Sequence, residues 1–418
     1  MNPFNKISSR NWFYGWMIVA VSNLILTVVF GIRLSFTVFF IALIDDFGWS
    51  RADTSLIFST SMIVFAATST LAGTWLDRWG ARRTFGIGAA VLTLGLLLSS
   101  QIQSLFQLAV TYGVIAGVGV TILGLGPIAS LIARWFKKQR GMAIGIAFAG
   151  TGVGTLLITP GTEYVISAHG WQIAYISLAG LTLLIIPFIA YLLRLNPSEL
   201  QLQPDGRTSQ IAAEDAVQPG GDWSMQDAIR TPSFWLLMIA ALGAIGPIRM
   251  LTVHQLAIIV DAGFERSYAA LMVGISGAIT SVAFILLGAI SDRIDRRWVY
   301  LFGSISLVYA IFILEQLHSP AQSNLVLMYA ILLGFGEGSR ASLLTAVASD
   351  LFPGNALGAI NGAVGAAFGV GAAILPWLAG LFYDLQGSYR TGFIAAAGAV
   401  LISTITLGLA PVFIRRNH

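Results

Sequence analysis

The sequence contains no cysteine and little charge. Of its 418 residues, 10% are charged and 56% are hydrophobic. The absence of cysteine excludes disulfides, thiolate metal sites and thiol nucleophiles. Soluble domains carry about 25% charged residues, so this composition does not fit a water-exposed surface. What the sequence has instead is repeated apolar stretches of about 20 residues, the length of a membrane-spanning helix. We therefore predict a polytopic integral membrane protein.

Two further absences narrow the class. The chain has no GxxxxGK[ST] loop for nucleotide phosphates, which argues against a nucleotide-driven pump. It has no clustered His, Asp or Ser constellation and no metal-ligand spacing, so neither an enzyme nor a cofactor is expected. The basic residues are spread over loops, which does not suggest nucleic acid as a partner.

The apolar stretches predict an all-α membrane protein with twelve transmembrane helices. The expected spans are roughly 13–42, 54–76, 82–101, 105–133, 141–166, 171–193, 232–260, 267–290, 298–316, 323–349, 356–384 and 390–413. Seventeen of the 23 basic residues fall in loops and tails on one side, and only Arg51, Arg266 and Arg390 on the other. This bias predicts that both termini are cytoplasmic. We expect a monomer in the cell (plasma or inner) membrane.

A duplication divides the chain into two halves. The polar segment 195–231 separates six spans from six, and we interpret it as a cytoplasmic linker between a bundle at 1–194 and a bundle at 232–418. "DFGWSR" at 46–51 matches "DAGFER" at 261–266, and "GTWLDRWGARR" at 73–83 matches "GAISDRIDRR" at 288–297, both at an offset of 215 residues. Internal repeats of this kind are typical of secondary transporters, whose substrate site lies between the repeats.

These motifs resemble a known family. The first "DR" loop resembles the signature of the major facilitator superfamily, and its second copy replaces the later glycine by Asp295. Three further segments are similar to the monocarboxylate transporter and oxalate:formate antiporter group: "YGWMIVA" (14–20), "RWFKKQRGMAIGIAFAGTGVG" (134–154) and "GAINGAVGAAFGVGAAILPWLAGLFYDLQGSY" (358–389). The resemblance covers nearly the whole chain. It implies two pseudo-symmetric six-helix bundles, with spans one, four, seven and ten lining a central cavity.

The resemblance also implies a gate. Asp77 with Arg78, and Asp292 with Arg293, are then a cytoplasmic gate that latches neighbouring helices. Their alternative role is to anchor the loops on the positive side of the membrane.

Three arginines fall inside the predicted spans. Arg33 and Arg249 each lie about 18 Å from the outer end of their helix, and Arg340 about 15 Å from the inner end of its own, so all three are near the midplane. Inserting a charged side chain at the bilayer midplane costs at least about 2.5–3.5 kcal/mol of free energy, so such a side chain usually faces a cavity or a partner. Since a guanidinium binds carboxylates bidentately, we expect these arginines to bind an anionic substrate. The alternative is that helix carbonyls satisfy them in a purely structural role.

Glu337 lies three residues from Arg340, which places both on one face of a continuous helix. The pair is either a structural salt bridge or a proton-sensitive switch, in which an anion that competes for the arginine favours protonation of Glu337. His254 matches a position that the subgroup often fills with histidine, and is a substrate-site or gate candidate; its alternative is a packing role.

The chain departs from the subgroup in span eight, 267–290, which lacks the arginine that monocarboxylate transporters carry there. The span-eleven lysine of oxalate exchangers is also missing. Arg33, Arg249 and Arg340 would have to replace these residues. The membrane arginines, Glu337 and the resemblance together predict a secondary transporter that moves a small, monocarboxylate-like organic anion by alternating access and is coupled to protons. A dicarboxylate exchanger and a non-transporting sensor of the same fold are the alternatives.

Overall fold

We describe the protein from a computed structural model, which covers residues 13–136, 139–200, 202–204, 223–291, 293–352 and 357–415. Within these residues the regular structure is helical, without strands. Most of the predicted linker, 205–222, lies outside them.

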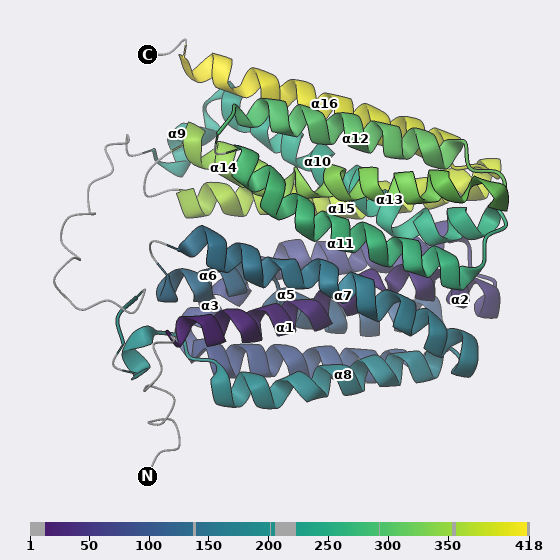
Figure 1. Ribbon diagram of the computed structural model, residues 1–418, viewed down its shortest axis with the longest axis horizontal. Helices are drawn as coiled ribbons and strands as arrows, with labels where there is room; N and C mark the ends of the chain where they lie inside the picture. Colours follow the sequence, from purple (N-terminus) through teal and green to yellow (C-terminus); the bar gives the residue numbers. More distant parts are fainter. Residues whose placement is uncertain are drawn as a thin grey trace.

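The first half is a bundle of long helices, coloured purple to teal in Figure 1. Its helices are α1 (Gly15–Leu34), α2 (Phe36–Phe47), α3 (Arg51–Ser99), α4 (Leu105–Leu108), α5 (Gly117–Ile122), α6 (Leu125–Trp135), α7 (Arg140–His169) and α8 (Trp171–Leu192). A π-helical segment, Ala109–Ala116, joins α4 to α5.

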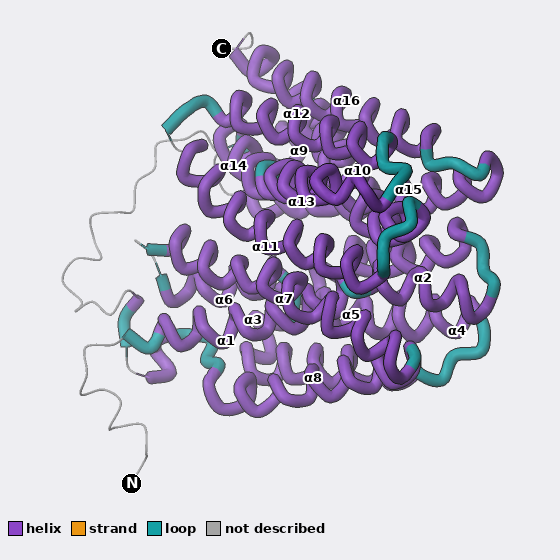
Figure 2. Tube along the Cα trace, turned by 45° about the vertical axis from the view of Figure 1, so that its right-hand side comes forward, coloured by secondary structure: helices purple, strands orange, loops and turns teal. Residues whose placement is uncertain are grey.

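The second half is a separate bundle, coloured teal through green to yellow in Figure 1. After the short α9 (Met225–Ile229) it contains α10 (Pro232–Asp261), α11 (Arg266–Ser291), α12 (Arg296–Glu315), α13 (Ser323–Gly338), α14 (Ala341–Leu351), α15 (Leu357–Gln386) and α16 (Arg390–Arg415). The helices of both halves run in nearly the same direction along the long axis, as the tube view also shows (Figure 2).

The helices make twelve passages through the molecule. In the described residues, ten segments are long and apolar enough to span a membrane. The other two are the part of α3 before Gly80 and the pair α13–α14. Gly80 has φ 78° and ends the helical path of the second span, a conformation that glycine adopts without a side-chain clash. The expected twelve helices in two bundles are confirmed.

Local sequence explains where several helices begin or break. Ser50 caps α3 by accepting a hydrogen bond from the Asp53 amide. Thr231 caps α10, and Pro232 occupies its first turn, where no amide donor is needed. The first span breaks at Ser35, whose hydroxyl donates to the Gly31 carbonyl over 2.7 Å. Such bonds back to the preceding turn bend helices.

The two halves meet mainly along two helix pairs, α7 with α11 and α3 with α15, and α2 also contacts α10. Small residues allow this approach. A Cβ built on Gly152 of α7 would lie 2.1 Å from the Gly277 carbonyl oxygen of α11, and one on Gly369 of α15 would lie 2.7 Å from Ala66 of α3. Glycine at these contacts therefore sets the spacing of the halves.

The same interface separates toward the end that carries the chain termini. Gly73, Gly145, Gly288 and Gly365 lie on the contacting faces of α3, α7, α11 and α15, one to three turns beyond the close contacts. A Cβ built on any of them meets no described atom within 4 Å. Among the described residues, the close contacts between the halves therefore lie toward the end opposite the termini.

Candidate functional site

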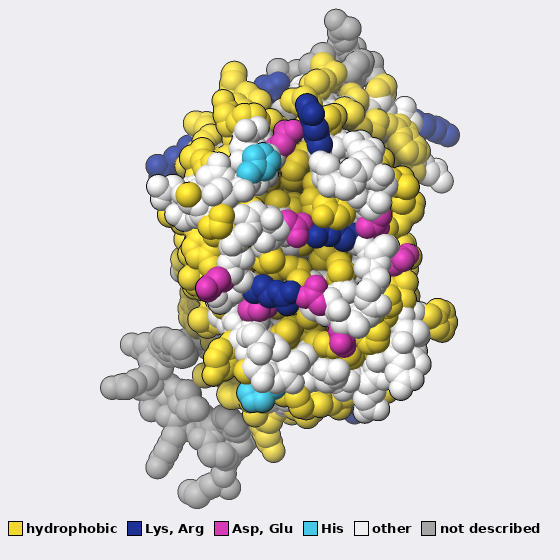
Figure 3. Space-filling model, turned by 90° about the vertical axis from the view of Figure 1, so that its right-hand side faces the viewer, with side chains coloured by type: hydrophobic (Ala, Val, Ile, Leu, Met, Phe, Trp, Pro, Cys, Tyr) yellow, Lys and Arg dark blue, Asp and Glu magenta, His cyan; other side chains and the backbone are white. Residues whose placement is uncertain are grey.

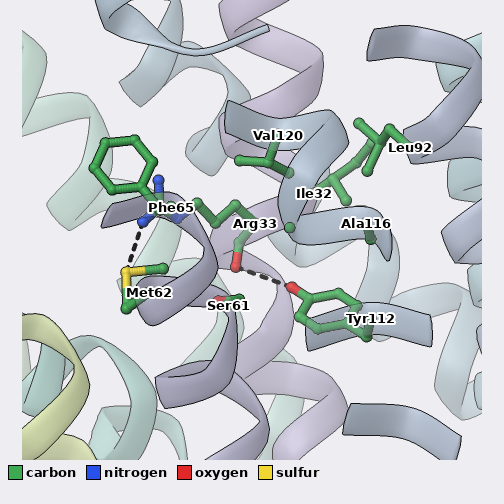
Figure 4. Close-up of a pocket in the computed structure, with 10 residues that line it drawn as sticks. Ile32, Arg33, Ser61, Met62, Phe65, Leu92, Tyr112, Ala116 and Val120 are labelled. Carbon is green, nitrogen blue, oxygen red and sulfur yellow. Dashed lines mark hydrogen bonds between the residues drawn. The ribbon is translucent and has the colours of Figure 1, made fainter. Parts of the chain in front are cut away.

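Arg33 of α1 lines a narrow hollow in the first half, shown in Figure 4. Its Nη2 donates to the Met62 sulfur over 2.8 Å, and its guanidinium carbon lies 5.4 Å from the centre of the Phe65 ring and 5.6 Å from that of Phe30. The remaining lining is apolar except for the hydroxyls of Ser61 and Tyr112. Among the described residues, no carboxylate forms an ion pair with Arg33. Because a thioether is a weak acceptor, most of the hydrogen-bond donor capacity of the Arg33 guanidinium is unused.

Arg249 of α10 forms an ion pair with Glu337 of α13. Arg249 Nη2 lies 2.5 Å from a Glu337 carboxylate oxygen, and the side chains are 14% and 17% exposed. Pro247 lies two residues before Arg249 inside α10. A proline removes one backbone hydrogen bond of the helix at this level of α10. The pair therefore joins two spans of the second half while remaining within reach of water.

The predicted pairing of Glu337 with Arg340 is wrong. The tenth span breaks after Gly338, and α14 begins only at Ala341, so the two side chains do not share one helix face. Arg340 is fully buried. It donates instead to the Tyr300 hydroxyl over 2.8 Å and to the Ser304 hydroxyl over 3.1 Å.

Arg33, Arg249 and Glu337 form one electrostatic group. The charges of Arg249 and Glu337 both act on Arg33, although Arg33 belongs to the other half. With all three ionised, two positive charges and one negative charge leave one surplus positive charge. That Arg33 and Arg249 face one shared site stays a prediction; the ion-pair partner of Arg249 is Glu337 of the same half.

His254 of α10 is fully buried and forms hydrogen bonds with both ring nitrogens. Nε2 lies 2.8 Å from the Pro376 carbonyl oxygen, and Nδ1 lies 3.0 Å from the Tyr389 hydroxyl. Because a carbonyl can only accept, Nε2 carries the proton and Nδ1 accepts from Tyr389. The edge of the ring contacts Phe40 of the other half, with 5.0 Å between ring centroids. His254 is thus part of the packing between the halves in this conformation.

A cluster of charges that sequence reasoning did not assign to a function closes the end opposite the termini. We call it the loop-end latch; its charged members are Asp45, Arg51, Asp261, Arg266 and Asp384. Arg51 of the first half pairs with Asp261 of the second over 2.7 Å, and Arg266 of the second pairs with Asp45 of the first. Figure 3 views this end and shows basic side chains lying between acidic ones across its centre.

Aromatic and backbone groups complete the loop-end latch. The Arg51 guanidinium stacks on Tyr383, with 3.9 Å to the ring centroid, and donates to the Tyr389 hydroxyl over 2.8 Å. Asp384 accepts from the backbone amides of Arg51 (3.0 Å) and Ala52 (2.7 Å). A carboxylate from the second half therefore caps the first turn of a helix of the first half, where the helix dipole favours negative charge. The duplicated "DFGWSR" and "DAGFER" motifs were the available signal for this cluster.

The predicted gate at the terminal end is only partly described. Arg78 and Arg293 are exposed. The side chain of Asp77 and the residue Asp292 lie outside the described part of the structure. The gating role of these four residues stays a prediction.

Two six-helix bundles with charged groups between them define a membrane transport protein rather than an enzyme. The family model of the Major Facilitator Superfamily matches residues 21–293 and 250–418. The chain belongs to this superfamily. It is 25% identical to monocarboxylate transporter 14 of Mus musculus, with 95% of the chain and 90% of the relative covered. It is 26% identical to monocarboxylate transporter 11 of Homo sapiens, with 95% and 83% covered.

Solved structures share the fold. A nucleoside transporter superposes with a TM-score of 0.72 at 11% identity, covering 95% of this chain and 99% of that one. A bacterial homologue of the human lysosomal transporter Spinster, in an inward-facing, unoccupied conformation, superposes with a TM-score of 0.65 at 15% identity, covering 96% of each chain. The family model and the monocarboxylate transporter relatives confirm the resemblance to this group that the motifs indicated.

Proposed function

We propose that the protein transports a small organic monoanion by alternating access and couples this transport to protons. Arg33 and Arg249 bind the anion from opposite halves, and Glu337 carries the coupled proton. The observation that carries the proposal is Arg33, a guanidinium in the middle of a membrane span without a carboxylate partner among the described residues.

The charge of the group favours an anion. A charged side chain at this depth is costly unless a partner or a cavity compensates it. The Arg249–Glu337 pair is neutral as a unit, and Arg33 supplies the surplus charge that a single carboxylate would balance. A dianion would be balanced by Arg33, Arg249 and Glu337 only after Glu337 has taken up a proton, which raises the net charge of these three residues from one to two positive charges.

The coupling follows from competition for Arg249. A substrate carboxylate that approaches Arg33 also reaches the field of Arg249, and it weakens the attraction between Arg249 and Glu337. Loss of that attraction favours the neutral form of Glu337. Anion and proton therefore bind together, as symport requires. Arg249, and not Arg340, takes the role of the arginine partner in this scheme. We omit Arg340 and His254 from the binding group because both are fully buried.

The proposed orientation places both termini in the cytoplasm of the cell, with the protein in the plasma or inner membrane. The excess of basic residues in the loops on the terminal side supports this orientation. The conformation is then inward-facing, with the loop-end latch closing the external side. The proposed bundle limits, 1–194 and 232–418, follow from the linker composition.

Uptake into proteoliposomes tests the proposal. We would measure labelled lactate, acetate, oxalate and a neutral nucleoside, each with and without an internal pH more alkaline than the external pH. Accumulation of a monocarboxylate that depends on the pH difference is expected. Oxalate exchange without pH dependence would favour the exchanger, and absence of both uptake and counterflow for every anion would favour a sensor.

A further inference from the structure

The tenth span breaks directly beside Glu337. Helix α13 ends at Gly338 and α14 begins at Ala341, leaving Ser339 and Arg340 between them. A continuous helix would place Arg340 on the same face as Glu337, where the two would pair. The break turns Arg340 away, and among the described residues the ion-pair partner of Glu337 is Arg249.

Hydroxyl groups of a neighbouring helix hold Arg340 in its turned position. Tyr300 and Ser304 of α12 accept its two hydrogen bonds, and its guanidinium carbon lies 4.7 Å from the centre of the Tyr300 ring. Its Nε has no acceptor in the described structure. Arg340 is thus a fully buried cation with no carboxylate partner in the described part of the chain, where two hydroxyls and one aromatic face compensate its charge.

The Tyr300 and Ser304 hydroxyls also form hydrogen bonds with residues of another span. The Tyr300 hydroxyl lies 2.5 Å from that of Ser403 on α16, which donates to the Ala240 carbonyl of α10 over 2.6 Å. Thr404 of α16 donates to Ser304 over 2.7 Å. We call Tyr300, Ser304, Ser403 and Thr404 the hydroxyl anchor. It connects the break in the tenth span to α10, the helix that carries Arg249.

Close packing holds the break against α12. A Cβ built on Gly303, between the two acceptors, would lie 1.7 Å from the Ser339 hydroxyl oxygen and 2.5 Å from its Cβ. Only glycine leaves room for Ser339 in this position. The anchor and this contact both act on the two residues that separate α13 from α14.

We propose that Arg340 is a positioning residue: the hydroxyl anchor withdraws it from Glu337, so that Arg249 is the sole ion-pair partner of the proton-carrying carboxylate. This inference rests on the proposed coupling role of Glu337. Around Glu337, the charged and titratable groups are Arg249 on α10, Arg33 on α1, Tyr329 on α13 itself and the anchored Arg340. If Arg340 joined Arg249 at the carboxylate, two cations would hold Glu337 ionised. Substrate binding at one of them would no longer release it.

The test removes the Tyr300 and Ser304 hydroxyls that accept from Arg340 and keeps the aromatic ring at position 300. In Tyr300→Phe/Ser304→Ala, buried N–H groups of Arg340 lose their hydrogen-bond acceptors. Because unsatisfied buried donors are costly, turning Arg340 toward the Glu337 carboxylate, which can accept them, becomes favourable. The pH at which anion uptake is half-maximal should fall by about one unit or more, since a neighbouring arginine favours the ionised carboxylate. Adding Arg340→Gln to the double variant should return this pH toward the wild-type value. Thermal stability of each purified variant is measured in parallel.

A merely structural anchor predicts another pattern, in which stability and transport rate fall while the pH profile stays at the wild-type position. That result, or a shift that Arg340→Gln does not reverse, overturns the inference. Where the double variant does not fold, Ser304→Ala alone should produce a smaller shift in the same direction, and an unshifted profile counts against the anchor. Glu337→Gln in the same series separates the two proposals. A wild-type profile in Glu337→Gln overturns the coupling and this inference together. If uptake by Glu337→Gln does not depend on pH while the profile of Tyr300→Phe/Ser304→Ala stays at the wild-type position, the coupling stands and only the positioning role of the hydroxyl anchor is overturned.

Discussion

At the scale of single residues, the arginines inside the membrane differ in what surrounds them, although the sequence presents them alike. Arg340 is enclosed by hydroxyls and an aromatic ring, Arg249 has a carboxylate, and Arg33 has one thioether contact among the described residues. A guanidinium has five donors, and a thioether is a poor acceptor for them. Of the three arginines, Arg33 therefore has the most unused hydrogen-bond donors with which to bind a ligand.

Replacing Arg33 tests this assignment. In Arg33→Gln the anion loses charge-assisted hydrogen bonds worth about 1.5–3 kcal/mol, which corresponds to roughly 10- to 100-fold weaker apparent affinity. Arg33→Lys keeps the charge but not the bidentate geometry, and should recover only part of the loss. The measurement is the concentration dependence of uptake in proteoliposomes. Arg230→Gln, at an exposed arginine, is the matched control and should behave as wild type. Unchanged affinity in Arg33→Gln would remove this residue from the binding group.

Replacing Glu337 tests the coupling. Glu337→Gln fixes the neutral form, so uptake no longer depends on a proton from the more acidic side. Accumulation driven by an external pH below the internal pH should be lost, whereas exchange of anion for anion should continue. Both are measured on the same proteoliposomes, with and without the imposed pH difference. Retained pH-driven accumulation would leave Arg249–Glu337 as a structural ion pair.

At the scale of helices, hydropathy predicts where the spans lie but not where they break. The spans were expected within a few residues of the observed helices because each apolar run must cross the same thickness of membrane. The break at Ser339 and Arg340 could not be predicted, because the acceptors that stabilise it, Tyr300 and Ser304, lie about 40 residues earlier in another span. Spacing alone favoured the pair of Glu337 with Arg340, and the tertiary contacts reversed that choice.

The loop-end latch gives a prediction at this scale. Arg51→Gln removes the ion pair with Asp261 and the bond to Tyr389, so this end should open more often. Exposed ion pairs contribute about 0.2–1 kcal/mol, and the added contacts of Arg51 suggest a 2- to 10-fold effect. The probe is a single cysteine at Thr37, which is buried and whose hydroxyl donates to the Val253 carbonyl of the other half. Its labelling by a maleimide should accelerate.

Arg390→Gln is the control for this experiment. Arg390 pairs with Glu315 at the same end of the molecule, but both residues belong to the second half. Its loss should leave labelling at Thr37→Cys unchanged. Equal acceleration in both variants would mean that the end loosens generally and that Arg51 has no special part in holding the halves together.

At the scale of the whole molecule, the two halves are related by the duplication that the 215-residue offset indicated. The loop-end latch reflects this relation within one residue: Arg51 of the first repeat pairs with Asp261 of the second, and its equivalent Arg266 pairs with Asp45, the neighbour of Asp46, which is the equivalent of Asp261. The repeats predicted equivalent residues in equivalent loops. Their pairing across the interface could not be predicted from sequence, because it exists only in the conformation that brings these loops together.

Alternating access requires that opening one end closes the other, and this gives the last prediction. Cysteines are placed singly at Thr37, which lies between Arg33 and the loop-end latch along the first span, and at Gly365, where a built Cβ meets no described atom within 4 Å. In oriented vesicles, an impermeant maleimide should label Gly365→Cys only from the side that carries the termini. In the proposed alternating-access mechanism the halves move as rigid bundles around the central charges, so Arg51→Gln should accelerate labelling at Thr37→Cys and slow it at Gly365→Cys. Faster labelling at both positions would indicate local loosening of the loops in place of a rocking motion.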